Sequence, residues 1–120
     1  MPNEQKNKRA FDLEHRTMKF ALDVRALVQR LTKTLISSDD IKQLLRSSGS
    51  VGANYIEANE ALSKKDFFMR IKICRKESKE SRYWLLLIQQ IPENLTAEKD
   101  KLIQEATELM KIFNAIIQKM

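Results

Sequence analysis

Residues 63–92 read SKKDFFMRIKICRKESKESRYWLLLIQQIP, and this stretch decides the fold. Ser63 and Asp66 have the spacing of a capping box, which predicts a helix that begins at Ser63 or Lys64. Apolar and small residues recur every three or four positions, as they do on the buried face of a long helix. Pro92 then ends the segment. The expected buried face consists of Phe67, Ile71, Cys74, Ser78, Ser81, Leu85 and Ile88.

Three further amphipathic helices are expected around this one. The chain of 120 residues contains only two Gly and two Pro, so it lacks the turn residues that all-β folds need. Ser38 and Thr96 are candidate N-caps. Short connections between long amphipathic helices predict an all-α, antiparallel up-down four-helix bundle. The expected segments are a flexible tail at residues 1–10, helices at about 11–33, 39–61, 63–92 and 97–119, and one domain over residues 11–120.

The second helix contains both glycines of the chain, Gly49 and Gly52. Each costs roughly 1 kcal/mol relative to Ala in a helix interior. Close approach of a neighbouring helix at Ser48, Gly52 and Ala58 would compensate for this cost, and a break near Gly49 is the alternative. The inward face of this helix is expected to consist of Ile41, Leu44, Leu45, Ser48, Val51, Gly52, Tyr55, Ile56 and Leu62.

Composition and missing motifs exclude several classes of function. Cys74 is the only cysteine, which excludes an internal disulfide and a multi-cysteine metal site. His15 is the only histidine, we expect it on the surface, and no inward-facing Glu-x-x-His pair exists. No Gly-rich phosphate loop or nucleophile motif is present. We therefore expect no enzymatic activity, no metal and no cofactor.

The sequence also lacks segments that would place it in or across a membrane. Its first residues have no apolar core of the kind that a signal peptide requires. No stretch approaches the roughly 18 apolar residues of a membrane span. These features predict a cytoplasmic protein.

Positive charge is concentrated on the third helix. Residues 63–92 contain eight Lys or Arg against three acids, a net +5 of the chain's +6. Like-charge neighbours four residues apart, such as Arg75 and Lys79, cost stability, so we interpret the face as a surface for an anionic partner. The alternative is a solvated face that prevents aggregation. The candidate nucleic-acid-binding residues are Lys64, Lys65, Lys72, Arg75, Lys76, Lys79 and Arg82 on this helix and Arg16, Lys19, Arg30 and Lys33 on the first.

Contacts at this surface are expected to involve phosphate groups and to be insensitive to sequence. No aromatic residue is expected to interleave with the cations for base stacking. No base-reading motif is recognisable either.

Apolar residues outside the expected core point to self-association. An isolated bundle needs one apolar stripe on each helix, whereas the first and third helices carry additional apolar residues on other faces. We interpret these as a homo-oligomer interface, and a monomer with a wider core is the alternative. The candidate interface residues are Met18, Leu22, Met69, Ile73, Glu77, Glu80, Trp84 and Leu87.

Two stretches carry a resemblance to a known family. Residues 50–67, SVGANYIEANEALSKKDF, and residues 76–87, KESKESRYWLLL, resemble the bacterial "four helix bundle protein" family. Its members include proteins encoded by intervening sequences within 23S ribosomal RNA genes. The resemblance implies an up-down four-helix bundle that assembles as a ring-like homopentamer, with no established enzymatic activity.

A related branch of that family is the accessory protein of diversity-generating retroelements. This accessory protein is a basic pentameric barrel that associates with a reverse transcriptase and with nucleic acid. The resemblance therefore implies three kinds of partner: other copies of the chain, RNA or DNA, and a reverse transcriptase or other protein.

The sequence as a whole predicts a non-enzymatic, homo-oligomeric helical bundle that binds nucleic acid without sequence specificity. The alternative is a protein-interaction scaffold whose basic face docks an acidic partner protein.

Overall fold

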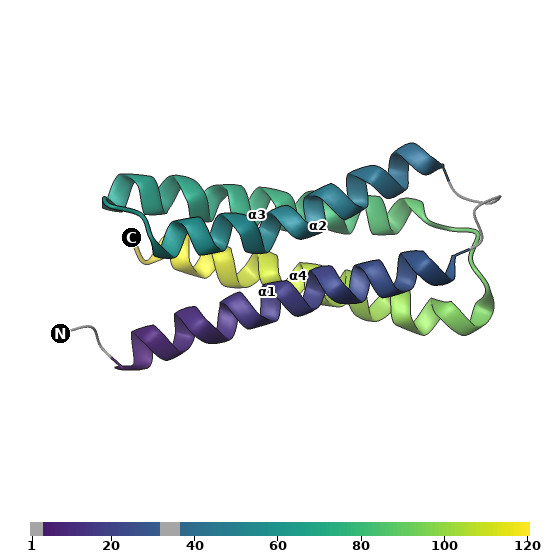
Figure 1. The fold of residues 1–120 in the computed structure, drawn as a ribbon, viewed down its shortest axis with the longest axis horizontal. Helices are drawn as coiled ribbons and strands as arrows, with labels where there is room; N and C mark the ends of the chain where they lie inside the picture. The colour runs from purple at the N-terminus through teal and green to yellow at the C-terminus, as the bar shows by residue number, and fades with distance from the viewer. Residues whose placement is uncertain (1–3, 32–36) are drawn as a thin grey trace.

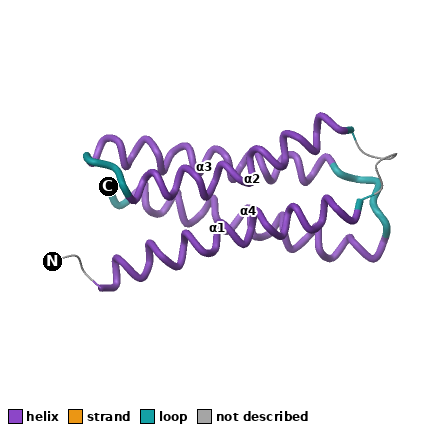
Figure 2. Tube along the Cα trace, in the orientation of Figure 1, coloured by secondary structure: helices purple, strands orange, loops and turns teal. Residues whose placement is uncertain are grey.

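Four long helices form an antiparallel up-down bundle in the computed structural model, which describes residues 4–31 and 37–120 (Figure 1). Within these residues, Figure 2 shows helices joined by loops and no strand. The predicted fold class is confirmed. The elements are α1 (Glu4–Arg30), α2 (Ser38–Asn59), α3 (Lys64–Leu87), the 3₁₀ helix η1 (Glu93–Leu95) and α4 (Thr96–Gln118).

The helices are arranged so that α1 and α3 occupy opposite corners of the bundle. Each helix packs against its neighbours in the sequence, and α1 also packs against α4. The face of α3 that is predicted to be buried does lie in the core, where Ile71, Cys74 and Leu85 are inaccessible to solvent. Phe67 is only partly buried. The long third helix thus supplies one wall of the core, as its periodicity predicts.

Small polar residues line the contact between α2 and α3. Ser47 and Ser81 are fully buried, and their hydroxyl oxygens lie 2.9 Å apart. The thiol of Cys74 donates to the carbonyl of Val51 at 3.5 Å, and burial raises the pKa of this thiol to about 12. Because each hydroxyl also bonds a carbonyl of its own helix, the two backbones approach closely without unpaired polar groups.

Both glycines lie inside a continuous α2, so the break considered near Gly49 is absent. A Cβ added to Gly52 would lie 3.0 Å from Oγ1 of Thr17, which is the close helix approach predicted for this position. Gly49 instead leaves room for Arg25, whose Nη2 would lie 3.2 Å from an added Cβ. The same Nη2 donates to the carbonyl of Leu45 at 3.2 Å and links α1 to α2.

Three predicted helix starts differ from the structure. Helix α1 begins at Glu4 rather than Phe11, because residues with good helical propensity continue the helix beyond its apolar stripe. Ser37, not Ser38, caps α2 and accepts from the backbone N–H of Asp40 at 3.4 Å. Thr96 is the first residue of α4 rather than its cap, because η1 precedes it.

The start of α3 agrees with the prediction and its end does not. The hydroxyl of Ser63 accepts from the N–H of Asp66 at 3.1 Å, so the predicted cap is confirmed. The helix ends at Leu87, and Ile88 turns into an extended conformation with its side chain buried in the core. Lys99 of α4 donates a hydrogen bond to the carbonyl of Ile88.

Two residues expected on the inner face of α2 point elsewhere. Ile56 is 49% exposed because it lies more than a quarter turn from the stripe that contains Val51 and Tyr55. Leu62 is fully exposed because it lies in the connection after α2. Ser47 is fully buried, although it was not among the residues expected on the inner face.

Candidate functional site

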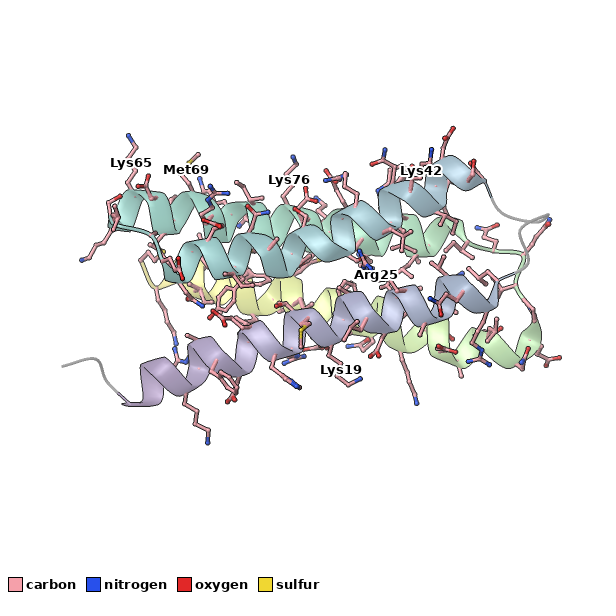
Figure 3. All side chains as sticks on the ribbon, viewed as in Figure 1. Lys19, Arg25, Lys42, Lys65, Met69 and Lys76 are labelled. Carbon is pink, nitrogen blue, oxygen red and sulfur yellow. The ribbon has the colours of Figure 1, made fainter. Side chains whose placement is uncertain are left out.

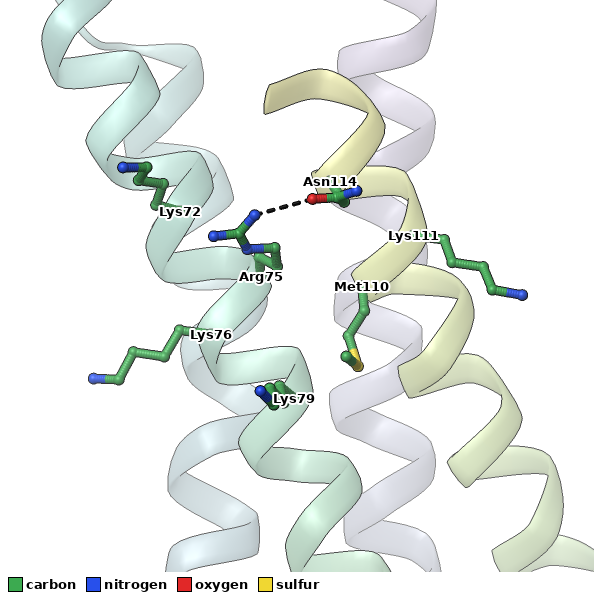
Figure 4. Close-up of a pocket in the computed structure, with 7 residues that line it drawn as sticks. All are labelled: Lys72, Arg75, Lys76, Lys79, Met110, Lys111 and Asn114. Atoms are coloured by element: carbon green, nitrogen blue, oxygen red, sulfur yellow. Dashed lines mark hydrogen bonds between the residues drawn. The ribbon is translucent and has the colours of Figure 1, made fainter. Parts of the chain in front are cut away.

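A groove between α3 and α4 is lined mainly by cations. Its volume is about 520 Å³, and five of its seven lining residues are Lys or Arg. Among the described residues, no carboxylate lines it. The lining residues, which Figure 4 shows, are Lys72, Arg75, Lys76, Lys79, Met110, Lys111 and Asn114.

Helical periodicity places the four α3 cations of the groove together. Positions 72, 75, 76 and 79 follow the i, i+3, i+4, i+7 pattern of one helix face and span about 10 Å along the axis. In Figure 4, Lys72 and Lys76 extend from α3 on the side away from α4, and Lys111 extends from α4 on the side away from α3. Arg75 points across the groove toward α4. The groove therefore has charged rims on both helices.

Three of the five cations have no ion pair among the described residues, whereas Lys76 and Lys111 each lie near a carboxylate, Lys111 at 3.7 Å from Glu108. Arg75 donates to Oδ1 of Asn114 at 3.0 Å, and this acceptor is neutral. Nζ of Lys72 lies 4.5 Å from the centre of the Phe68 ring, a cation–π contact that also leaves the charge in place. Lys76 lies 3.9 Å from the carboxylate of Glu80, and both side chains are substantially exposed.

Arg46 pairs with two of the three acids of α3, neither of which lines the groove. This residue of α2 pairs with Glu77 at 2.9 Å and with Glu80 at 2.7 Å. Glu77 is 5% exposed at its side chain, so the pair lies at the edge of the core. Both carboxylates are thus drawn toward α2, while the cations of the same helix face outward and toward α4.

The three described candidate cations of α1 lie elsewhere and are paired. Arg16 binds the carboxylate of Glu105 through two hydrogen bonds of 2.8 and 2.7 Å, which raise the pKa of the Arg16 guanidinium. Lys19 donates to Asp23 at 2.6 Å, and this bond raises the pKa of Lys19. Arg30 pairs with Glu98 at 2.6 Å, and Lys33 lies outside the described residues.

The structure therefore separates the cations that the sequence groups together. Figure 3 shows Lys65 and Lys76 on one side of the bundle and Lys19 on the other. Lys64 and Lys65 are exposed at the start of α3, where they continue its basic face. Arg82 is half-buried at the other end of that face.

Sequence reasoning missed the α4 side of the groove and two aromatic residues beside it. Met110, Lys111 and Asn114 complete the groove, and only a knowledge of helix packing brings them to α3. Phe68 lies four residues before Lys72, and Tyr83 lies four residues after Lys79, on the same helix face. Phe68 thus lies among the cations of this face and Tyr83 at its end, and the i, i+4 spacing could have revealed both; whether either ring stacks on a base stays a prediction.

The candidate interface residues fall into two groups. Four have exposed apolar side chains: Met18 at 55%, Leu22 at 56%, Met69 at 54% and Leu87 at 42%. The others are at least partly occupied within the chain. Ile73 and Trp84 are half-buried, and Glu77 and Glu80 pair with Arg46 instead of remaining free for another subunit.

The described residues offer no second type of site. They contain no cluster of three or more His, Cys, Asp or Glu side chains that could hold a metal ion. No helix among them is long and apolar enough to cross a membrane.

Fold and site together define an all-α, up-down four-helix bundle protein with a cationic groove between α3 and α4. The chain belongs to the 23S rRNA-intervening sequence protein family, whose model matches residues 9–115.

A solved structure from the S23 ribosomal protein family of Bacteroides thetaiotaomicron is similar to this chain. That protein is of unknown function, and the two chains share 29% sequence identity with a TM-score of 0.78. The similarity covers 91% of this chain and 97% of the other. No curated protein matched the chain. Neither the family nor the similar structure is described as an enzyme.

Proposed function

We propose that this protein is a non-enzymatic, homo-oligomeric scaffold that binds RNA or DNA through phosphate contacts in the groove between α3 and α4. The observation that carries the proposal is the gathering of five cations around one groove that no described carboxylate lines. Elsewhere on the chain, cations such as Arg16 and Arg30 are matched with carboxylates.

The energetics of phosphate binding suit such a groove. Each Lys or Arg that neutralises a phosphate releases a condensed counterion, so affinity comes from the number of contacts and falls with salt. Long, exposed lysines such as Lys72 and Lys79 can follow the backbone without reading base edges. The complex is therefore expected to tolerate most sequences.

Self-association is the second part of the proposal. Met18 and Leu22 expose apolar side chains on the face of α1 opposite its core stripe, and Met69 and Leu87 do so on α3. The family resemblance implies a pentamer. Several copies in one assembly would bring several grooves to one nucleic acid and raise its avidity. Multi-angle light scattering tests this part, and a monomer at micromolar concentration would contradict it.

The nucleic-acid part is tested by reversing the charge of the groove. Binding of a short fluorescent oligonucleotide is followed by anisotropy, and circular dichroism checks that each variant folds. We expect the reversed groove to lower affinity at least about 100-fold, because four phosphate contacts become repulsive. Affinity equal to that of the unmodified protein would contradict the proposal. The variant is K72E/R75E/K76E/K79E.

A matched control separates the effect of the groove cations from the effect of the protein's net charge. The control makes the same change of charge at four exposed lysines distributed over three helices and the C-terminus. We expect it to lose much less affinity than the groove variant, and an equal loss would mean that only the overall charge matters. The control is K8E/K42E/K101E/K119E.

An acidic protein partner is the alternative to nucleic acid, and a pull-down with and without nuclease treatment tests it. Carboxylates would also match the groove, and the resemblance implies a reverse transcriptase among such partners. A partner that stays bound after nuclease treatment, and is lost from the groove variant, would favour protein docking over nucleic-acid binding.

A further inference from the structure

We infer that the groove selects single-stranded over double-stranded nucleic acid, with Tyr83 stacking on a base at one end. This inference rests on the proposed function, since it names the form of nucleic acid that the same groove takes. The carrying observation is an exposed aromatic ring in line with the cations of α3.

Tyr83 is placed as a stacking surface by its neighbours. It lies one helical turn after Lys79 on the outward face of α3 and remains 55% exposed. Its ring meets the ring of Trp84 edge-on, with centroids 5.2 Å apart and planes at 72°. Trp84 itself packs against the core, so it supports the tyrosine ring from one side only.

The other aromatic residue on this face is less available. Phe68 is half-buried, and the ammonium group of Lys72 lies over its ring. The groove therefore has one open stacking position, which gives the site two distinguishable ends.

The distance along α3 fits a short single strand. Lys72 and Tyr83 are separated by eleven positions, or about 16 Å of helix rise. At about 3.4 Å per stacked nucleotide, this length corresponds to roughly five nucleotides. Site sizes of about 4–16 nucleotides are found for OB folds, which also combine a basic groove with aromatic side chains.

A duplex would use this site less completely. Bases in a duplex are stacked on one another and present no free face to Tyr83, whereas an unpaired base does. Met110 adds an apolar, polarisable side chain to the groove lining, where a base gains a contact and a phosphate does not. Both features favour a strand whose bases are accessible.

The test compares a single-stranded oligonucleotide with a hairpin duplex of the same composition. We expect the single strand to bind more tightly. Tyr83→Ala should weaken single-strand binding by about 5- to 150-fold, because one base–aromatic contact contributes roughly 1–3 kcal/mol. Tyr83→Phe should restore it, since stacking needs the ring and not the hydroxyl. Duplex binding should change little with either substitution.

Two controls make the result specific. Phe11 is 68% exposed on α1, so Phe11→Ala removes another exposed aromatic side chain away from the groove and should leave binding unchanged. Trp84 is the only tryptophan, so its emission should respond to the single strand and lose most of that response in Tyr83→Ala.

The outcomes separate this inference from the proposed function. Equal binding of single strand and duplex, with Tyr83→Ala binding as the unmodified protein does, would overturn the inference and leave the phosphate groove intact. If the charge-reversed groove variant also binds normally, the proposed function is overturned as well.

Discussion

The two grooves that flank α4 differ in charge although both lie beside a helix rich in cations. The α3–α4 groove has five cations and no described carboxylate, whereas the α1–α4 groove of about 420 Å³ has two lysines and three acids. The α1–α4 groove is lined by Lys19, Phe20, Asp23, Glu98, Lys101, Leu102 and Glu105. The comparison teaches that the cations of one helix leave a groove positively charged only when the facing helix does not neutralise them.

Two features produce this difference. On one side of α4, Glu98 and Glu105 meet the cations of α1, while on the other side Lys111 and Asn114 meet those of α3. In addition, Arg46 of α2 pairs with Glu77 and Glu80 of α3 and holds both carboxylates toward α2. Charge in the grooves is thus decided by helix pairing.

Removing Arg46 should have the largest effect on the molecule. Arg46→Met leaves the carboxylate of Glu77 at the edge of the core without its partner. We expect the free energy of unfolding to fall by about 1–3 kcal/mol, the usual cost of an unsatisfied buried polar group. Urea denaturation measures it. Arg46→Lys is the control and should lose less stability, because it keeps a positive charge beside Glu77. If Arg46→Met is as stable as the unmodified protein, Glu77 does not need Arg46.

A single carboxylate in the α3–α4 groove should make it resemble the α1–α4 groove. Asn114→Asp places an acid next to Arg75, whose Nη1 lies 3.0 Å from the present amide oxygen. We expect affinity for a single-stranded oligonucleotide to fall about 3- to 10-fold, because the new ion pair competes with phosphate. Gln118→Glu adds the same charge at an exposed position near the end of α4 and should change affinity less. Equal losses in the two variants would argue against a local effect.

Freeing a cation of the α1–α4 groove should have the smallest effect. Glu105→Gln removes the two hydrogen bonds to Arg16, but Asp23 and Glu98 still line that groove. We expect nucleic-acid affinity to change by less than about 2-fold and stability to fall by about 0.5–1 kcal/mol, as for other partly exposed pairs. Anisotropy and urea titration measure the two quantities. A large gain in affinity would show that α1 is also a binding surface.

The sequence predicted the fold and the basic face of α3 because both depend on periodicity within one helix. Ser63, Ile71 and Leu85 follow directly from capping and from the 3.6-residue repeat. The small core face of α3 and the close approach at Gly52 were predicted for the same reason.

The remaining features depend on which helices face one another, which periodicity does not reveal. Arg46 is an ordinary surface arginine in the sequence, and only its position opposite Glu77 and Glu80 gives it a role. Likewise, Arg16 and Lys72 look equivalent in the sequence. In the structure, Arg16 pairs with the carboxylate of Glu105, whereas Lys72 shares its groove with the neutral Asn114. Contacts between helices therefore separated the candidate cations into paired and available ones.

The salt dependence of single-strand binding tests the central claim most directly. If all five cations of the α3–α4 groove contact phosphates, log Kd of the unmodified protein should rise with log salt concentration with a slope of about 3.5 per groove, from about 0.7 per phosphate. The variant K72E/R75E/K76E/K79E should bind too weakly to measure. A slope near zero, or the same slope and affinity in that variant, would contradict a phosphate-binding groove between α3 and α4.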